Sequence, residues 1–597
     1  MASFKSTVIT ERGHNLMAKI ATGSTKMHFT KIRTSDSNPS DGSLPTLTTL
    51  SSIKQVIDIS EVAIVNNATV RVSGAVSNAD LASGYFVRVI GLYAQDPDLG
   101  EILYSVTKAE EADYMPPNNG LSSSSLMINL LTVTSNADNV TINVDPGAVA
   151  TIGDINEVKG QIEDIKGFVG YSDEGVIGLE WDVKNKTVKR IGDAIGKNAG
   201  EDFDEYNMYG NRKKCIINDA GVVLAYLGEA GYTESGKLVT AVTVNGTNYP
   251  VGTHVQVMVE QPAFWYKSVP IDFKKIPGKR GFSVQKIRYY ISETARFGFK
   301  LHPAFYTRDG SKTPVDKIYL SAYEGCAYDV SAGNYIINDE QIVDFTANSG
   351  DKLSSIINVK PISGLTQDFT RAKARIIAKN RGTGWGLEDI FSNSMSQLLF
   401  AIEYGSFDTQ GQIGQGVVNK SDDGSTNMSE PTGATFDIGN GSGMAPGTNG
   451  LVSVIYRGQE NFWGNIYKWE DGLNVYADGE NNQAYIAYGN FQDSKIDGDY
   501  IDVGFELANV NAYISAIGWS EVCDFAFLAT ETLGASNRPI EDRFYQNAAS
   551  VGHRVSDVSG HWAVSLNAGG FLRNVTSTPS TRNRNLGARL LFVPTGS

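Results

Sequence analysis

The chain has 597 residues, of which 62 are glycine and 20% are charged, a composition that predicts several domains rich in loops and β-structure. Its net charge is −15 and no basic block occurs, so we expect no nucleic-acid partner and no anionic membrane surface as a partner. The three cysteines are far apart and form no CxxC pair, which indicates neither a disulfide framework nor a zinc site. We expect free, buried thiols.

The N-terminal stretch MASFKSTVITERGHNL lacks the long apolar core of a signal peptide. No run of about eighteen apolar residues follows it, so we expect no membrane insertion. The sequence therefore predicts synthesis in a cytoplasm. If the protein acts outside a cell, lysis or a particle would have to carry it there.

Residues 1–150 predict one compact α+β unit. Residues 10–21 predict a helix, with Leu16, Met17 and Ile20 on one face and Gly23 after its end. Runs rich in β-formers follow, separated by Asp, Asn, Pro and Gly. The predicted strands are residues 26–32, 53–59, 68–76, 85–93, 102–106, 126–133 and 140–144.

Residues 154–169, DINEVKGQIEDIKGFV, carry apolar residues three or four positions apart, which is a heptad pattern. Its seam consists of Ile155, Val158, Ile162, Ile165 and Val169. β-Branched residues along a seam favour three or more strands, so these five predict a short trimeric coiled coil. Because two heptads are too short to be stable alone, the alternative is one amphipathic helix packed on its own domain.

The chain beyond residue 176 predicts many short strands and two helices, an α+β pattern. Residues 365–378 predict the first helix, with Thr366 as its N-cap, and residues 389–404 the second. Residues 419–450 are rich in Ser, Gly, Asn and Asp and predict a surface loop.

Residues 1–150 contain the motifs ITERGHNLMAKIATG, FTKIRTSD, FVRVIGLYAQDPDLGEILYSV and TINVDPGAVAT. Together these motifs resemble the N-terminal module of tail fibres from contractile-tailed phages and related bacteriocins. The most specific piece is Gly91-Leu92-Tyr93 followed by GEILY at residues 100–104. The resemblance implies that residues 1–150 attach a fibre to the baseplate of a particle.

Motifs in the remainder resemble phage and prophage proteins with a C-type lectin-like fold, which the variable proteins of diversity-generating retroelements and formylglycine-generating enzymes share. They include FKLHPAFY, RGTGWGLEDIFSNSMSQLLFAIEYGSFDTQ and YRGQENFWGNIYKWEDGLNVY, and the most telling pieces are WGN at 463–465 and GAR at 587–589. The expected fold is therefore α+β and multidomain. An attachment domain spans residues 1–150, a trimeric coiled-coil junction spans 151–175, and a lectin-like receptor-binding head spans 176–597.

No catalytic motif is present, and we expect no enzyme. Formylglycine-generating chemistry needs two reactive cysteines close together, whereas Cys215, Cys326 and Cys523 are dispersed singles. HExxH and GxxxxGK[ST] are absent, and the six histidines form no triad-like signature. The alternative is a depolymerase that hydrolyses a host surface glycan, which needs two carboxylates about 5–10 Å apart on a concave face.

Two segments have two interpretations each. DGLNVYADGENN at residues 471–482 and DSKIDGDYID at 493–502 gather oxygen ligands as calcium loops do, but tight turns need the same residues, and we favour turns. We therefore expect no cofactor, with a structural Ca²⁺ as the alternative. Trp463, Tyr467 and Trp469 could stack a sugar, but their spacing also fits a strand in the core, which we favour.

Residues 543–585 alternate large polar or aromatic side chains with small ones. In the diversified lectin-like proteins, the matching part displays ligand contacts on one exposed face. Such side chains give contact area or adaptable hydrogen bonds at modest entropic cost. The resemblance therefore implies ligand binding by Phe544, Tyr545, His553, Arg554, His561, Trp562, Phe571, Arg573, Asn574, Arg582, Asn583 and Arg584.

Together these features predict a homotrimeric tail fibre, or receptor-binding protein, of a phage or a phage-tail-like bacteriocin. Its expected partners are baseplate or tail proteins and a bacterial surface glycan or surface protein. Its expected location is the virion or an extracellular particle, after synthesis in the bacterial cytoplasm. An adhesin displayed on the bacterium itself would need a secretion signal or an anchor, and neither is visible in the sequence.

Overall fold

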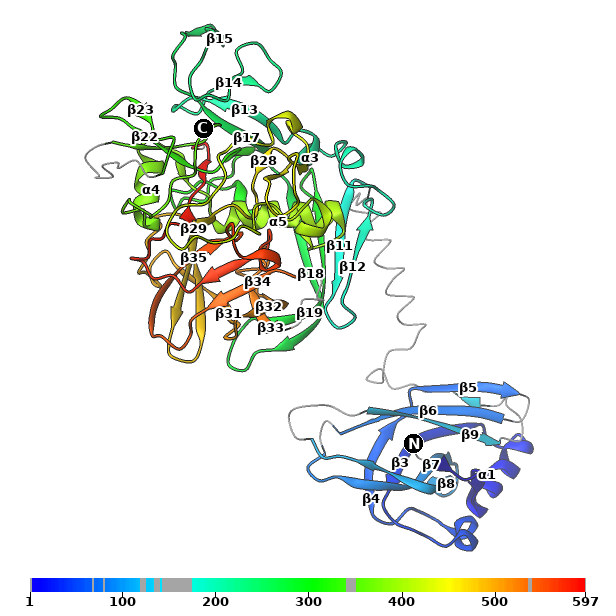
Figure 1. The fold of residues 1–597 in the computed structure, drawn as a ribbon. Helices are drawn as coiled ribbons and strands as arrows, with labels where there is room; N and C mark the ends of the chain where they lie inside the picture. The colour runs from blue at the N-terminus through cyan, green and yellow to red at the C-terminus, as the bar shows by residue number, and fades with distance from the viewer. Residues whose placement is uncertain are drawn as a thin grey trace. The chain divides into compact units, whose positions relative to one another are not determined.

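A computed structural model describes residues 3–66, 69–78, 81–118, 125–133, 140–141, 174–339, 350–534 and 540–595 (Figure 1). The chain divides into two compact units, Met1–Gly170 and Tyr171–Ser597. The predicted heptad at residues 154–169 lies outside the described residues, so the coiled coil and the trimer stay predictions. In the described parts, no helix is both long and apolar enough to cross a bilayer.

The predicted helix near the start of the first unit is confirmed as α1 (Glu11–Ala21). Thr10 caps it, because its side chain accepts a hydrogen bond from the Gly13 amide at 3.0 Å. The helix lies so close to a neighbouring strand that a Cβ on Gly13 would be 2.2 Å from the Tyr104 carbonyl oxygen. Gly13 is therefore required by this contact.

Strands make up most of the rest of the described part of unit 1, and six of the predicted runs coincide with strands. The seventh, 140–144, is described only at Val140–Thr141, which form a short strand. The larger sheet has the order β1 (Ser3–Phe4), β8 (Gly100–Met115), β7 (Tyr85–Asp96), β3 (Met27–Ser35), β10 (Val140–Thr141), with β2 (Val8–Ile9) on β8 and β4 (Ile53–Asp58) on β3. The smaller sheet is β5 (Glu61–Asn66), β6 (Thr69–Ser77), β9 (Ser125–Val133). A 3₁₀ turn, η1 (Asp41–Thr46), precedes β4.

The second unit is built on two large sheets. The first has the order β12 (Thr187–Gly192), β11 (Val176–Asp182), β19 (Phe282–Ser292), β32 (Ala512–Trp519), β34 (Arg543–Gln546), β36 (Arg573–Val575), β35 (Gly552–Val558), β29 (Tyr467–Ala477), β30 (Asn482–Ile486), β31 (Ile501–Leu507). Beside this path lie β18 (Trp265–Lys275), β20 (Lys300–Leu301), β33 (Ala529–Leu533) and β37 (Leu586–Gly587). The second large sheet is β14 (Val223–Tyr226), β13 (Lys213–Ile217), β17 (Gln256–Pro262), β21 (Lys317–Ser321), β38 (Leu590–Phe592), β25 (Trp385–Leu387).

Smaller elements complete unit 2. The small sheets are β15 (Val242–Val244) with β16 (Thr247–Tyr249); β23 (Asn334–Tyr335), β22 (Cys326–Asp329), β24 (Lys352–Ser354); and β26 (Gly443–Met444), β27 (Val454–Tyr456), β28 (Gln459–Glu460). The helices are α3 (Asn207–Gly210), α4 (Arg371–Lys379), α5 (Ile390–Tyr404) and α6 (Thr409–Gln412), with 3₁₀ turns η3 (Glu201–Phe203), η4 (Pro303–Phe305), η5 (Phe436–Ile438) and η6 (Ser565–Asn567).

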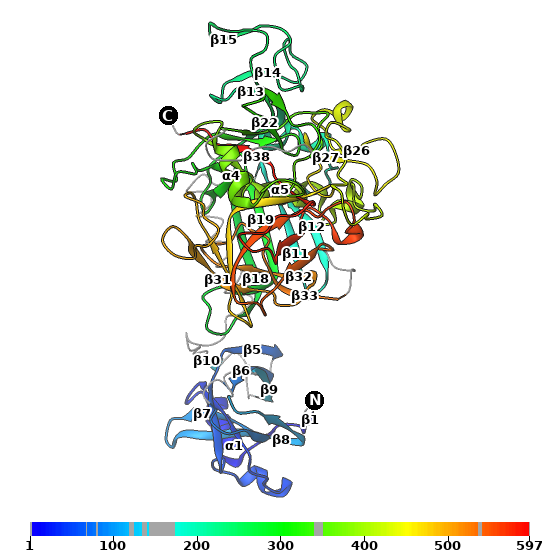
Figure 2. The same cartoon turned by 60° about the vertical axis from the view of Figure 1, so that its left-hand side comes forward.

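Helix α5 passes through the middle of unit 2, between the two large sheets (Figures 1 and 2). Asp389 and Ser392 form a capping box at its start, and Gly405 ends it in the left-handed conformation, at φ 61°. Every residue from Ile390 to Glu403 is buried, as expected of a helix with core on all sides. The predicted helix at 389–404 is confirmed.

The prediction for the other helix is wrong over its first turn, because α4 begins at Arg371. Thr370 caps it and accepts a hydrogen bond from the Lys373 amide at 3.3 Å. Thr366 instead donates its hydroxyl to the Asp339 carbonyl at 3.1 Å. A tertiary contact therefore takes the residue that the local pattern assigned to the cap.

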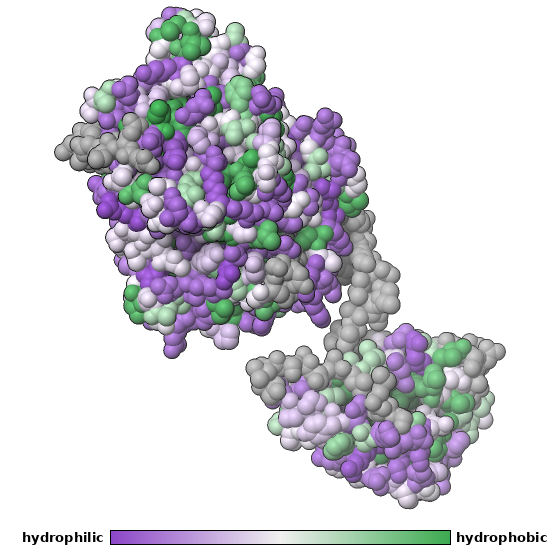
Figure 3. Space-filling model, in the orientation of Figure 1, coloured by the Kyte–Doolittle hydropathy of each residue, from purple (hydrophilic) through white to green (hydrophobic). Residues whose placement is uncertain are grey.

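Strands dominate both units, so the fold is mostly β with few helices, and the predicted α+β class overestimates the helical content. Trp463 and Trp469 are fully buried and Tyr467 is nearly so, which confirms that they belong to the core. Tyr467 and Trp469 lie in β29, whereas Trp463 lies in the bend before this strand. The three cysteines are free and buried, as expected. Over unit 2, hydrophilic residues predominate on the face in Figure 3, and apolar residues form small separate patches.

Candidate functional site: the C-terminal face of unit 2

The segment 543–585 contributes three neighbouring strands, β34, β36 and β35, to the larger sheet. Tyr545 lies opposite Asn574, and Asn574 lies opposite Asp557. Because side chains alternate between the two faces of a sheet, Phe544 and Arg573 point the other way. We call the side that carries Tyr545 and Asn574 the C-terminal face.

Five of the twelve predicted ligand-binding residues are buried, and for them the expected exposure is wrong. They are Phe544, Arg554, Trp562, Phe571 and Arg573. Phe571 packs edge-on against Phe407, with ring centroids 5.1 Å apart. Arg573 pairs with the buried carboxylate of Glu470 and donates to the Ser556 hydroxyl at 3.1 Å. Phe571 and Arg573 thereby join this part of the sheet to the core.

The other seven predicted residues reach the surface at least in part. Tyr545, His553, His561, Asn574 and Arg584 are half-buried, and Arg582 and Asn583 are exposed. His553 lies apart from the rest, against Tyr476, with ring centroids 5.3 Å apart. A role in ligand binding for these seven stays a prediction.

One group of side chains, which we call the His561 cluster, consists of Tyr467, His561, Trp562 and Arg584. The His561 ring lies 5.1 Å from Tyr467 and 5.1 Å from Trp562, between centroids. The Arg584 guanidinium lies 5.5 Å from the centre of the Trp562 ring. Burial lowers the pKa of His561 to about 4, so its imidazole is neutral at pH 7.

A second group, which we call the Arg543 stack, was missed by the sequence analysis apart from Tyr545. The guanidinium of Arg543 lies 5.8 Å from the ring centre of Tyr513 and 5.3 Å from that of Tyr545. Arg543 and Tyr513 are paired across β34 and β32. The two-residue spacing of Arg543 and Tyr545 is the only local signal for this arrangement, because Tyr513 lies thirty residues earlier in the chain.

Asp557 is buried on this same side of the sheet, because it lies opposite Asn574. It accepts two hydrogen bonds from the Asn574 amide, at 3.1 and 3.0 Å, and one from the Ser577 hydroxyl, at 3.0 Å. Burial raises its pKa to about 7 despite these donors. Burial also raises the pKa of the nearby Tyr467, with further contributions from Asp557 and Tyr545. The face therefore includes a buried carboxyl group that titrates near neutral pH.

The two surface carboxylates beside the His561 cluster are suited to pairing and not to acid catalysis. Arg584 contacts Asp422 at 2.6 Å and Asp423 at 3.2 Å. The hydrogen bond from Arg584 lowers the pKa of Asp422, and the hydroxyl of Thr426 lowers that of Asp423 to about 2. A glycosidase acid needs a raised pKa and access to substrate, a combination that neither residue offers.

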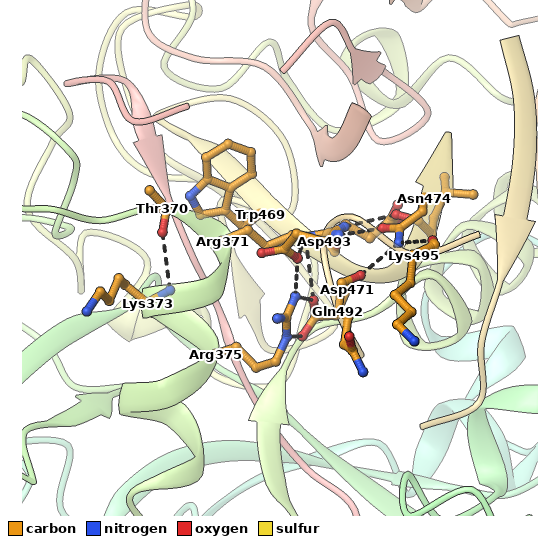
Figure 4. A network of polar contacts seen from close by, with 12 residues as sticks. Thr370, Arg371, Lys373, Arg375, Trp469, Asp471, Asn474, Gln492, Asp493 and Lys495 are labelled. Carbon is orange, nitrogen blue, oxygen red and sulfur yellow. Dashed lines mark hydrogen bonds and ion pairs between the residues drawn. The ribbon is translucent and has the colours of Figure 1, made fainter. Parts of the chain in front are cut away.

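Acidic side chains of the segments considered for calcium instead pair with arginine side chains of helix α4 (Figure 4). Arg375 contacts Asp471 and Asp493, each at 2.5 Å, and Arg371 contacts Asp493 at 2.8 Å. Burial disfavours the charged form of Asp493, but the two guanidinium groups hold its pKa below the usual value. Asp478 accepts hydrogen bonds from two amides of its own turn.

These contacts favour the turn interpretation over calcium loops. Among the described residues, no three His, Cys, Asp or Glu side chains converge as a metal site would require. The expected absence of a cofactor stays a prediction.

Residues 1–152 match the family model described as phage tail-collar fibre protein, N-terminal. The resemblance inferred for the first 150 residues is thereby confirmed. No curated protein matches the chain. The match places a module of tail-collar fibres at the start of this chain and says nothing of the residues that follow.

Solved structures similar to this chain include three variants of a Major Tropism Determinant. The U1 variant is 12% identical, with 63% of this chain and 78% of that chain covered and a TM-score of 0.24. The P3c variant is 12% identical, with 64% and 87% covered and a TM-score of 0.20. The I1 variant is 11% identical, with 70% and 94% covered and a TM-score of 0.23. TM-scores this low support no conclusion about unit 2.

Proposed function

We propose that this protein is the tail fibre, or receptor-binding protein, of a phage or a phage-tail-like bacteriocin, and that it attaches the particle to a bacterial surface. The observation that carries the proposal is the tail-collar fibre match over residues 1–152. In this proposal, residues 1–150 join the fibre to the baseplate or tail. Residues 176–597 form a receptor-binding head with a lectin-like fold.

The C-terminal face supports a role in binding. It presents aromatic rings, a neutral imidazole and guanidinium groups, which are side chains common in contact hot spots. The arginines are already held by stacking or pairing, so little side-chain entropy is lost when a ligand binds. The proposed ligand is a surface glycan or a surface protein.

The proposed assembly is a homotrimer joined through residues 151–175. Three linked heads would make the second and third contacts intramolecular, which raises the overall affinity by about 10²- to 10⁴-fold. Weak individual contacts would then suffice for firm attachment. This proposal rests on the heptad pattern in the sequence.

Deletion of residues 1–150 tests the division of labour. We expect the shortened protein to bind host cells and to be absent from assembled particles, as judged by cell sedimentation and by particle composition. If the shortened protein is folded but has lost both cell binding and incorporation into particles, the proposed division of labour is contradicted.

The alternative is a fibre that hydrolyses its receptor. Incubation of the protein with host cell-wall polysaccharide, followed by an assay for new reducing ends, separates the two functions. A pure binding protein leaves the number of reducing ends unchanged, and an increase that follows protein concentration would identify a depolymerase.

A further inference from the structure

A cavity of about 240 Å³ lies in unit 2, outside the segment 543–585. Its walls include three tyrosines, Tyr266, Tyr306 and Tyr488, which come from three separate parts of the chain. Cavities that hold drug-sized ligands are usually about 300–1,000 Å³. This cavity therefore suits one small chemical group, such as a single sugar residue.

The floor of the cavity is a buried carboxylate, Asp524, whose charge is balanced. It accepts hydrogen bonds from the Tyr266 hydroxyl at 2.5 Å and from the Ser268 hydroxyl at 3.1 Å. The ammonium group of Lys300 contacts it at 2.7 Å. These three donors fix both the carboxylate and the Tyr266 ring.

Tyr488 presents an aromatic wall that is supported from behind. Its ring stacks on Phe391, with centroids 4.5 Å apart and planes 28° apart. The ammonium nitrogen of Lys312 lies 3.9 Å from the centre of the Tyr488 ring. Because Lys312 is exposed and flexible, it can move off the ring and donate hydrogen bonds to a ligand that stacks there.

The third wall is a loop that two β-bridges hold in position. Residues 306–314 close on themselves through a bridge between Tyr306 and Pro314. A second bridge joins Asp309 to Gly489, and a Cβ on Gly489 would lie 2.5 Å from the Gly310 nitrogen. Binding in this cavity would therefore need little ordering of the protein.

The charges that line the cavity cancel, which identifies the class of ligand. Lys300 and Lys312 are balanced by Glu521 and Asp524. Aromatic walls with hydrogen-bonding groups, and no excess charge, suit the apolar face and the hydroxyls of a neutral sugar. We propose that this cavity binds one neutral hexopyranose unit of a surface glycan, stacked on Tyr488, as a site separate from the C-terminal face. This inference rests on the proposed role in receptor binding.

The test uses the full-length protein and saturation-transfer difference NMR with methyl α-D-glucoside, methyl β-D-galactoside and N-acetylglucosamine. We expect at least one probe to bind with a Kd on the order of millimolar, as befits a single sugar with few contacts. Val522→Trp, which fills the cavity from its wall, should weaken binding at least 10-fold. Lys312→Ala changes only an exposed side chain and should weaken binding several-fold. Val239→Trp makes the same exchange at a residue that is 66% exposed and outside the cavity, and it should leave binding unchanged.

The inference is overturned if none of the three sugars binds, or if the cavity variants bind as the wild type does. Tighter binding of glucuronic acid than of the three neutral probes would indicate a charged ligand and would overturn the neutral class. Adsorption of the same protein to host cells separates the two proposals. Adsorption without sugar binding removes only the cavity site, whereas no adsorption at all contradicts the proposed function.

Discussion

Asn574 spans the two carboxylate oxygens of the buried Asp557 with one amide group, at 3.1 and 3.0 Å, on the C-terminal face. This contact ties β36 to β35 and places a buried titrating group beside the proposed ligand surface. Its consequences for stability can be derived with a definite sign.

The raised pKa of Asp557 predicts that unit 2 loses stability as the pH rises. A folded-state value of about 7, against roughly 3.9 in an unfolded chain, means that the folded state holds the proton more tightly. The stabilisation is complete below pH ~4 and is lost between there and pH ~7, by about 4 kcal/mol at most. Asp557→Asn should remove this dependence, as measured by urea unfolding at pH 5 and pH 8. Asp497→Asn, at an exposed carboxylate, is the control and should keep it.

Loss of Arg375 should destabilise unit 2 strongly. Arg375→Met leaves Asp471 buried without its bidentate partner, which costs about 3–5 kcal/mol in comparable buried pairs. Arg582→Met makes the same exchange at an exposed residue and should change the unfolding free energy by less than about 0.5 kcal/mol. Equal urea midpoints for the two variants would show that the network in Figure 4 contributes little.

The Arg543 stack should contribute to host binding. Arg543→Ala removes the charge between Tyr513 and Tyr545, and we expect adsorption to host cells to fall about 10-fold, as loss of a hot-spot residue of about 1.4 kcal/mol would cause. Lys495→Ala, at a cation outside this face, serves as the control. Adsorption by Arg543→Ala at the wild-type level, with the fold intact, would place the receptor site elsewhere.

Gly13 should be essential to unit 1. Gly13→Ala places a methyl group 2.2 Å from the Tyr104 carbonyl oxygen, so α1 must shift and the unit should lose several degrees in Tm. Gly42→Ala has no atom within 4 Å of the new methyl group and should be neutral. The comparison, made by calorimetry on the full chain, fails if both variants melt alike. Incorporation into particles should follow the same order.

The proposed trimer predicts a solution mass of three chains by light scattering. Ile162→Asn places a polar side chain on the heptad seam. We expect this variant to dissociate at protein concentrations at which the wild type is still a trimer. The same substitution at Val169 should weaken the trimer less, because Val169 is the last residue of the seam. A wild-type protein that is monomeric at micromolar concentration would refute the trimer.

The sequence predicted elements whose determinants are local. α1 and α5 were found because their caps, Thr10 and Asp389, stand directly before a periodic apolar pattern. The start of α4 was missed because Thr366 bonds to Asp339, a residue outside the helix. Tertiary partners of this kind are invisible to a local pattern.

The same limit explains the C-terminal face. Composition indicated that residues 543–585 are exposed, but the direction of each side chain depends on the strand beside it. Arg573 points inward because Glu470, 103 residues away, pairs with it. Residues 419–450 show the same effect, because Asn427 is buried where the Pro361 carbonyl accepts its amide at 2.9 Å. The predicted surface loop is therefore partly interior.

The position of α5 has a consequence for the resistance of unit 2 to proteases. Tyr209 donates its hydroxyl to the Leu399 carbonyl on one side of the helix, and residues of both large sheets share one core with it. Because α5 and both large sheets contribute to one core, we expect unit 2 to unfold in one cooperative step. Proteases act mainly on partly opened chains, so a unit 2 without such intermediates should resist proteolysis, as the proposed function outside a cell would require.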